Sequence, residues 1–496
     1  MSIDNRYTTI FSGLLLISIS LLSGSCRKMI AIDEPINSIT SKEVFATDAQ
    51  ASSAMAGVYT MMINGVAAQA FGSGNISTLT GMSSDEFNFY TIDVNATPYV
   101  NNRLTASAAG SYSLWQSAYT AIYRANSVIE GIAASTSTRL HDSVGKGLTG
   151  ESKFVRALCY FYLTNLFGDV PLALTINFSK TQNMARTPQQ QVYQQIVNDL
   201  KDAIVALPAT YLPLNGVSAR IRPNKWAATA LLARVNLFLG NYSDAASLAG
   251  SVIGQSALYS LESDLNQVFL TGSHEAIWQL QQNGGSQYNG TATLEGMSYL
   301  PNPLNTGIAY YTMTPQLLNA FEANDARRTA WVGNTNNSVI AGQPPNTTYY
   351  PFKYKTGYYN RVISDYATPT EYYMVLRLAE QYLIRAEAEA NGAPGGVAAA
   401  IVDLNVIRSR AGLPALSSSL SRDQVIAAVA HERQIEFFGE WGHRWFDLKR
   451  TGKAREVLSQ LSTKQPWTGD YQLLYPIPPI EIQSDHNLVQ NPGYLF

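Results

Sequence analysis

The stretch His431-Glu-Arg-Gln-Ile-Glu-Phe-Phe-Gly-Glu-Trp-Gly-His-Arg-Trp-Phe-Asp-Leu-Lys-Arg450 is the densest part of the chain, and the rest is interpreted outward from it. Upstream, Ser421 and Gln424 stand three residues apart, the spacing of a capping box that starts a helix. The positions that then fall on one helical face are Val425, Ala428, Val429, Glu432, Ile435 and Phe438. Gly439 and Gly442 indicate where this helix ends.

Glu432 is the one carboxylate on that apolar face. A carboxylate buried alone costs several kcal/mol, so Glu432 must find a cation. Arg444 in the following turn is the nearest plausible partner, with Arg408 and Arg410 as rivals. We interpret Glu432 and Arg444, together with Trp445 and Asp447, as a buried structural lock. A catalytic role is the alternative, but ion-pair networks of this kind also arise for structural reasons.

Composition indicates a large globular chain with a weakly charged surface. It has 496 residues, of which 46% are hydrophobic and 14% charged, and a net charge of −2. This length suggests two or three domains, and this charge favours neither nucleic acid nor an anionic membrane as partner. The 29 tyrosines suit a neutral, hydroxyl-rich ligand, and they equally suit plain exposure outside the cytoplasm.

The N-terminus resembles an export signal. A short apolar run at residues 11–22 is too short to span a bilayer, and Ser23-Gly24-Ser25-Cys26 follows it. Small residues before a cysteine are typical of bacterial lipoproteins, so we expect residues 1–25 to be a signal peptide and 26–45 a tether lipidated at Cys26. Ordinary secretion with an incidental Cys26 is the alternative. The remaining cysteine, Cys159, then has no disulfide partner, and its apolar surroundings predict a buried thiol.

Helical periodicity predicts a mainly α fold. The predicted helices and helix pairs cover residues 48–64, 114–133, 151–167, 188–207, 226–246 and 371–411. The pairs 226–246 and 371–411 resemble tetratricopeptide repeats in their small residues and in their turns, Gly240-Asn241-Tyr242 in the first pair and Asn391-Gly392 with Pro394-Gly395 in the second. Such units cannot bury their faces alone and must stack, so we expect a tetratricopeptide-like helical-repeat scaffold.

Two irregular regions interrupt the helices, at residues 65–109 and 257–370. Irregular segments of this length in a compact domain are usually either functional or disordered, and the aromatic residues of the first one argue against disorder. Short strands are expected near residues 275–281 and 349–355. We divide the mature chain into an N-terminal helical region, 46–256, and a C-terminal region, 257–496. The second region contains the loop excursion 257–370 and the helices of 371–452, and it ends in an extended, proline-set segment that we expect to pack along a groove.

Four segments together resemble the SusD/RagB family of outer-membrane glycan-binding lipoproteins. They are Arg156-Ala-Leu-Cys-Tyr-Phe-Tyr-Leu-Thr-Asn-Leu-Phe-Gly-Asp-Val-Pro171, Leu376-Arg-Leu-Ala-Glu-Gln-Tyr-Leu-Ile-Arg-Ala-Glu-Ala388, the stretch from Glu432 to Arg450, and Leu474-Tyr-Pro-Ile-Pro478 with Gln490-Asn-Pro-Gly-Tyr494. The resemblance implies a tetratricopeptide-like scaffold that displays ligand loops on one side. It also implies a partner, a SusC-like TonB-dependent transporter that the lipid-anchored protein covers at the cell surface.

The resemblance does not identify the sugar or the residues that bind it, so candidates must come from chemistry. Aromatic rings match the apolar faces of sugars, and Asn, Asp and Gln side chains match their hydroxyls. The irregular regions supply Asp85, Asn88, Tyr90, Asn101, Tyr288, Asn289, Tyr299, Tyr310 and Trp331 as candidates. The alternatives are that each aromatic ring only covers the core, and that Asp85-Glu86 is a structural element.

Motifs of catalysis are not found. His431-Glu432 begins like a zinc-protease helix, but Ile435 stands where the second histidine should be. The sequence has no cysteine pair with zinc spacing, no Walker loop, no dinucleotide fingerprint and no nucleophile elbow. We therefore expect a binding protein with no cofactor, although Asp and Asn side chains would suit a structural calcium ion. The alternatives are a glycosidase, a peptide-binding protein and a lid that only gates the transporter.

Overall fold

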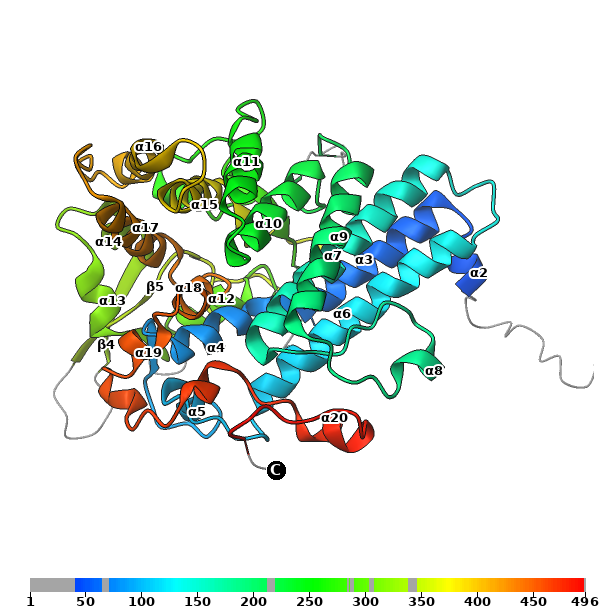
Figure 1. The fold of residues 1–496 in the computed structure, drawn as a ribbon, viewed down its shortest axis with the longest axis horizontal. Helices are drawn as coiled ribbons and strands as arrows, with labels where there is room; N and C mark the ends of the chain where they lie inside the picture. Colours follow the sequence, from blue (N-terminus) through cyan, green and yellow to red (C-terminus); the bar gives the residue numbers. More distant parts are fainter. Residues whose placement is uncertain are drawn as a thin grey trace, which may run out of the picture.

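The computed structural model describes residues 41–64, 71–211, 219–282, 285, 290–302, 307–337 and 346–494. Within them the fold is mainly helical, as predicted, and short two-stranded sheets accompany the helices (Figure 1). Three predicted residues, Cys26, Tyr288 and Asn289, lie outside the described residues. No helix in the described ranges is both long enough and apolar enough to cross a membrane.

The first half of the chain forms the predicted helices. They are α2 (Ser41–Val44), α3 (Asp48–Asn64), α6 (Ala109–Ala134), α7 (Asp142–Phe167), α8 (Phe178–Thr181), α9 (Gln189–Ala206), α10 (Lys225–Phe238) and α11 (Tyr242–Ile253). Helix α7 begins at Asp142, well before the predicted start at residue 151. The prediction missed this first part because its glycines are poor helix formers in isolation. One of them serves packing: a Cβ on Gly150 would lie 2.8 Å from the Cβ of Ala206.

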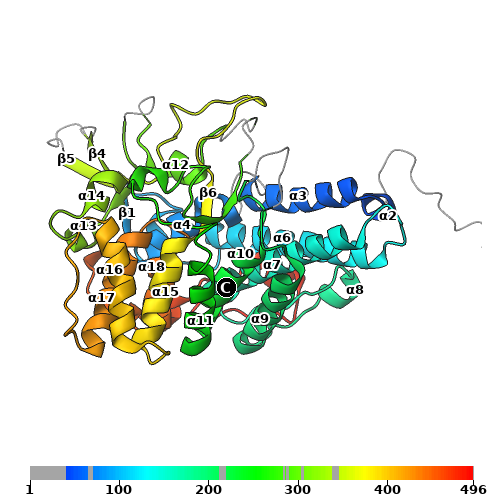
Figure 2. The same cartoon turned by 90° about the horizontal axis from the view of Figure 1, so that it is seen from above.

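The second half continues the stack. Its main helices are α15 (Leu378–Ala390), α16 (Gly396–Arg410), α17 (Arg422–Phe437) and α18 (His443–Arg450), followed by α19 (Ala454–Leu458) and α20 (Pro479–Ser484). From α6 and α7 through α9, α10, α11, α15, α16 and α17, each helix packs on the next along the series (Figures 1 and 2). This confirms the tetratricopeptide-like scaffold. Because α11 packs directly on α15, the boundary at residue 256 stays a prediction.

Three antiparallel strand pairs join distant segments. They are β1 (Phe87–Phe89) with β3 (Tyr311–Met313), β2 (Ala276–Leu280) with β6 (Tyr373–Arg377), and β4 (Val332–Asn337) with β5 (Asn346–Pro351). The strands expected near 275–281 and 349–355 are confirmed by β2 and β5. The helix pair expected from residue 371 instead starts with strand β6. A short apolar run fits a helix or a buried strand equally, and here pairing with β2 decides between them.

The regions predicted to be irregular contain more structure than expected. They hold the π-helical turn η1 (Phe71–Asn75), α4 (Ile76–Ser83), α5 (Thr97–Val100), η2 (Leu265–Gln267), α12 (Leu294–Tyr299), α13 (Pro315–Ala320) and α14 (Ala326–Trp331). Helix α4 is almost wholly buried, although its sequence is rich in Ser, Thr and Gly. The Thr78 hydroxyl donates to the Gly74 carbonyl, four residues back, which satisfies the polar side chain inside the helix. Tertiary packing therefore overrides weak local propensity.

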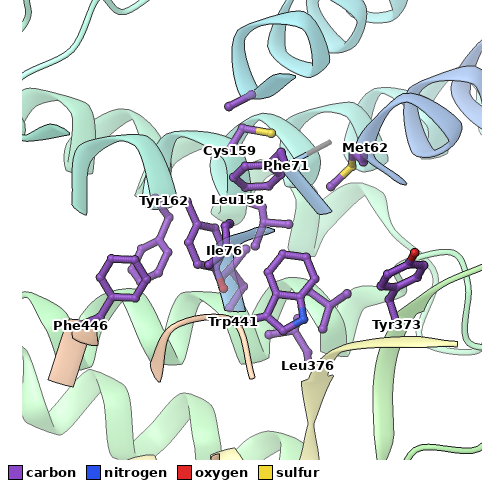
Figure 3. Packing of buried hydrophobic residues seen from close by; sticks show 14 of the residues in the cluster. Met62, Phe71, Ile76, Leu158, Cys159, Tyr162, Tyr373, Leu376, Trp441 and Phe446 are labelled. Carbon is purple, nitrogen blue, oxygen red and sulfur yellow. The ribbon is translucent and has the colours of Figure 1, made fainter. Parts of the chain in front are cut away.

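The core is centred on α7, α4 and the turn after α17. Figure 3 shows Tyr162 of α7 between Phe71 and the ring of Phe446, with Trp441 beside it. The ring centroids of Tyr162 and Trp441 are 5.6 Å apart, and those of Tyr162 and Phe71 are 5.3 Å apart. Cys159 is a free, fully buried thiol, as predicted. The stretch from His431 to Arg450 thus supplies aromatic rings to the centre of the fold.

Glu432 does find buried cations, but Arg444 is not among them. Its carboxylate accepts hydrogen bonds from Arg327 at 3.0 Å and from Arg408 at 2.8 Å. Arg408 was a rival in the prediction, whereas Arg327 lies in α14, about a hundred residues earlier along the chain, and no local pattern pointed to it. The other rival, Arg410, pairs with Glu275, just before β2, and with Glu436 of α17. Glu432 is therefore part of a buried network that fixes α17 to its neighbours.

Of the other predicted lock residues, Arg444 and Asp447 are largely buried and form ion pairs. Arg444 donates to both carboxylate oxygens of Asp85, at 2.8 and 2.7 Å. Asp447 accepts from Arg433 at 2.7 Å and from Arg450 at 2.8 Å. Trp445 is fully buried. These ion pairs tie the stretch to distant parts of the fold, with partners other than the predicted Glu432–Arg444 pair, and its role as a structural lock stays a prediction.

The C-terminal segment closes the fold against α7. The Tyr475 N–H donates to the carbonyl of Leu166 at 2.7 Å. The Asn491 amide donates to the carbonyl of Phe167 at 3.0 Å and accepts from the Arg186 guanidinium at 2.6 Å. These bonds occupy carbonyls at the end of α7 that have no partner within the helix. The expected packing of this proline-set segment along the body is confirmed.

Candidate ligand-binding surface

Residues 350–366 carry several tyrosines and one arginine that we call the aromatic loop surface. It comprises the half-buried Tyr350 together with Tyr358, Tyr359, Arg361 and Tyr366. Tyr358 is 38% exposed, Tyr359 58% and Tyr366 97%, which is unusual for side chains of this size. Figure 2 shows this segment as a yellow-green loop that rises on one face of the molecule, while α15, α16 and α17 extend toward the other. The scaffold thus displays these rings on one side.

Hydrogen bonds brace this loop at its base and in its middle. The Glu371 carboxylate accepts the backbone N–H of Lys355 at 2.6 Å and that of Thr356 at 2.9 Å. Farther along, the Thr291 N–H donates to the Val362 carbonyl at 2.9 Å, and the Val362 N–H donates to the Thr291 hydroxyl oxygen at 3.0 Å. The backbone that carries Tyr358 and Tyr359 is therefore held in place before any ligand arrives.

Two glycines allow the loop to sit against the body. A Cβ on Gly296 of α12 would lie 2.1 Å from the Thr356 carbonyl oxygen. Gly290 has a φ of +54°, and its Cβ would lie 2.3 Å from the Val362 carbonyl oxygen. Any side chain at either position would push the loop away, so the sequence at 290–296 sets the position of the tyrosines.

The aromatic loop surface combines flat apolar rings with hydrogen-bond donors. The Arg361 guanidinium lies 3.8 Å from the centroid of the Tyr358 ring, which orients both side chains. Partial burial and the neighbouring Tyr359 raise the pKa of Tyr350, so its hydroxyl stays protonated at neutral pH. Such a surface can stack on the C–H face of a ring and donate to hydroxyls around it.

Three of the predicted ligand residues are buried instead. Asp85 is held by Arg444, Tyr299 is 3% exposed, and Trp331 is not exposed at all. The Trp331 indole N–H donates to the Leu265 carbonyl at 3.0 Å, and the Lys353 ammonium lies 4.6 Å from its ring centroid. None of the three side chains is accessible to a ligand. In this structure they are part of the core, which was the alternative to a binding role.

The remaining described candidates lie on or near the β1–β3 pair. Asn88 belongs to β1, and the Tyr90 N–H donates to the Tyr310 carbonyl at 2.8 Å. Tyr310 stacks on Phe89, with ring centroids 5.7 Å apart. Asn101 caps the C-terminus of α5 through its backbone. All four are half-buried and adjoin solvent, so a role in binding stays a prediction for them.

The half-buried Tyr350 and the exposed Tyr358, Tyr359 and Tyr366 were not chosen as candidates from the sequence. The available signal was the two tyrosine doublets, Tyr349-Tyr350 and Tyr358-Tyr359, inside a polar segment. Tyr349-Tyr350 lies in strand β5, where neighbouring rings point to opposite faces, whereas Tyr358-Tyr359 lies in a turn and exposes both rings. Which tyrosines of this region are accessible to a ligand depends on their burial. Burial is set by the tertiary structure, so the sequence alone did not distinguish them.

No group of three or more His, Cys, Asp or Glu residues in the described part of the chain could hold a metal ion. The histidines do not form a site either. His443 is buried, and burial followed by nearby arginines places its pKa well below the usual range. His141 and His274 pair singly with acidic residues at the surface.

Comparison with protein-family models gives two matches, in two parts of the chain. A model described as "SusD family" matches residues 327–494. A model described as "Starch-binding associating with outer membrane" matches residues 39–237. Together they cover the α3–α10 helices and the whole C-terminal part from α14 onward.

Individual relatives agree with these models. A SusD-like protein of Formosa agariphila, P2, is 27% identical over 438 residues, which cover 80% of this chain and 83% of the relative. A solved SusD superfamily protein of Bacteroides vulgatus has the same fold, with a TM-score of 0.76 at 22% identity, over 91% of this chain and all of that protein. A solved laminarin-binding SusD-like protein has a TM-score of 0.75 at 26% identity, again over 91% of this chain and all of that protein.

Proposed function

The chain belongs to the SusD family, and from this premise we propose that it is a cell-surface glycan-binding lipoprotein. It captures an oligosaccharide and delivers it to a SusC-like TonB-dependent transporter of the outer membrane. The observation that carries the proposal is the aromatic loop surface, which combines exposed tyrosines with a backbone fixed by Glu371 and Thr291. The laminarin-binding relative with the same fold supports a glycan as ligand.

The chemistry of the surface favours a neutral glycan bound through shallow contacts. Tyr358, Tyr359 and Tyr366 offer ring faces, and Arg361 offers N–H donors. Few desolvated charges are available to anchor a ligand, so affinity has to come from several weak contacts and should be micromolar or weaker. Such binding suits capture and release at a transporter.

Membrane attachment and the lack of catalysis are part of the same proposal. The family model that matches residues 39–237 is described by association with the outer membrane. Lipidation at Cys26 would supply the anchor. The buried carboxylates of the α17 network are paired with arginines, which makes them unsuitable as the acid and base of a glycosidase. We therefore assign binding without hydrolysis.

The proposal is tested by retention of the full chain, purified in detergent, on native gels containing laminarin, starch or other plant, fungal and host polysaccharides. Retarded migration on at least one polysaccharide is the expected result. Absence of retardation on every gel, with a folded protein by circular dichroism, would overturn it. That outcome favours the alternative, a lid that gates the transporter or binds peptides. Release of reducing ends from a polysaccharide would instead show an enzyme.

A further inference from the structure

A small pocket open to solvent lies on another part of the surface. It has a volume of about 210 Å³ and lies where β1, the start of α13 and the turn η4 (Ser462–Lys464) meet. Its polar lining includes Asn88, Gln316, Ser462 and Thr463, and its apolar lining includes Phe87 and Val100. None of the residues that define the aromatic loop surface lines it.

The polar side chains of this pocket are available to a ligand. Within the described part of the chain, the amides of Asn88 and Gln316 and the hydroxyls of Ser462 and Thr463 have no hydrogen-bond partner in the protein. Amides and hydroxyls both donate and accept, so four of them around one cavity match a compact molecule with several hydroxyl groups.

The walls of the pocket are rigid. The Lys464 ammonium is buried at its base and donates to the carbonyls of Met82 at 2.9 Å and Val100 at 3.0 Å. On the other side, the Thr314 N–H donates to the Glu86 carbonyl at 2.9 Å. These bonds tie three distant segments together before binding, which lowers the entropy that a ligand has to offset.

Charge and size narrow the ligand class. The Lys464 ammonium is committed to backbone carbonyls, and the free lining groups are neutral, so nothing in the pocket attracts an anion. Pockets for drug-sized ligands measure about 300 Å³ or more, and this one is smaller. It therefore has room for one ring, not for an extended chain.

We propose that this pocket binds a single neutral sugar unit, such as one end of an oligosaccharide whose other units lie on the aromatic loop surface or in solvent. The inference rests on the proposed glycan-binding function and adds a separate subsite of different selectivity. The aromatic loop surface would contact ring faces along a glycan chain. The pocket would select one sugar unit by the positions of its hydroxyl groups, because a polar group that loses water on binding and finds no partner costs free energy.

The test is saturation-transfer NMR on the full chain in detergent, with glucose, galactose, mannose and xylose as separate probes. Wild type should give a signal with at least one of these sugars. The double variant Asn88→Ala/Thr463→Ala should weaken that binding at least tenfold. A matched double variant elsewhere on the surface, Thr136→Ala/Asn198→Ala, should leave it unchanged. The exposed pair Gln316→Ala/Ser462→Ala provides a second pocket variant, should the first fail to fold.

Polysaccharide gels run on the same proteins separate the two proposals. Wild type that is retarded on a gel, but gives no monosaccharide signal, overturns the pocket and leaves the proposed function standing. The same conclusion follows if the pocket variants bind monosaccharide as wild type does. Wild type that is retarded on no gel overturns the proposed function, and the pocket proposal falls with it.

Discussion

Arg444 donates hydrogen bonds of 2.8 and 2.7 Å to Asp85, a residue 359 positions earlier in the chain. Both side chains are largely buried. This two-bond pair fastens the first turn of α18 to the segment between α4 and β1. The segment continues into the strand that carries Asn88, so the pair also positions one wall of the polar pocket.

Removing one partner of this pair should be costly. Arg444→Ala leaves Asp85 buried without its cation, and we expect the free energy of unfolding to fall by about 3–5 kcal/mol. The exposed pair Lys453–Glu456 is the control, since Lys453→Ala should change stability by less than about 1 kcal/mol. Urea denaturation followed by circular dichroism measures both. Equal effects of the two variants would contradict a structural role for Arg444.

Truncating the exposed tyrosines should separate binding from stability. We expect Tyr358→Ala and Tyr359→Ala each to weaken polysaccharide binding about tenfold, or ~1.4 kcal/mol, because each removes a ring face from the aromatic loop surface. The urea midpoint should stay near that of wild type, since these side chains are exposed. Gel retardation at graded polysaccharide concentrations measures the first quantity. Undiminished retardation of both variants would place the ligand elsewhere.

Trp331 should behave in the opposite way. Trp331→Ala opens a cavity in the core and removes the ring that faces Lys353, so we expect a loss of about 3–5 kcal/mol in unfolding free energy. Tyr366→Ala, at a 97% exposed aromatic, is the matched control and should cost little. Thermal or urea unfolding compares them. A Trp331→Ala protein of wild-type stability would show that this ring does not hold the core.

The close approach at Gly296 gives a test of the braced loop. Gly296→Ala places a methyl group where the Thr356 carbonyl oxygen now lies, so the loop must move and binding should weaken. Gly147→Ala is the control: a Cβ there meets nothing within 4 Å, and the change within α7 should stabilise by about 0.5–1 kcal/mol. Limited proteolysis of the 356–366 loop, together with gel retardation, reports the displacement. Similar proteolysis of both variants would argue against it.

A buried carboxyl group should make stability depend on pH. Burial raises the pKa of Glu295 to about 8, and one of its oxygens has no hydrogen-bond partner among the described residues. Between the ordinary pKa near 4.5 and this value, the folded state holds a proton that the unfolded state has released. Stability contributed by the neutral group is therefore complete below pH 4.5 and declines as pH rises toward 8.

Glu295→Gln removes this dependence, because the amide stays neutral at every pH. The stability of the variant relative to wild type should therefore increase from pH 5 to pH 8, at up to about 1.4 kcal/mol per pH unit. Glu456→Gln, at an exposed position, should show no such trend. Urea unfolding at several pH values checks the sign. A constant difference across the range would mean that Glu295 is ionised in the folded protein.

Sequence reasoning predicted the helical scaffold well because its signal is local. The capping box of Ser421 and Gln424, the seam of α15 and the Gly-Asn turn of the α10–α11 pair each lie within one short window. Helix α4 was missed because its Ser, Thr and Gly residues favour loops, and only burial makes them helical. Strand β6 was missed because its pairing with β2 is a long-range contact.

The site was harder to predict for the same reason. The sequence shows that residues 257–370 are rich in aromatics, but it does not show which rings face outward. Trp331 and Tyr359 are equally plausible sugar platforms by residue type, and they differ only in what the fold puts over them: a lysine and the core in one case, solvent in the other. Likewise, the position of Glu432 on an apolar helix face predicted a buried cation beside it, but one of its partners, Arg327, is far away in the chain.

The bonds that end α7 have a consequence for the order of events during synthesis. The Leu166 carbonyl receives its donor from Tyr475, and the Phe167 carbonyl receives one from the nearby Arg186 and another from Asn491. Tyr475 and Asn491 are made more than three hundred residues after the carbonyls that they contact. The contacts at the C-terminal end of α7 are therefore completed only when nearly the whole chain has been synthesised.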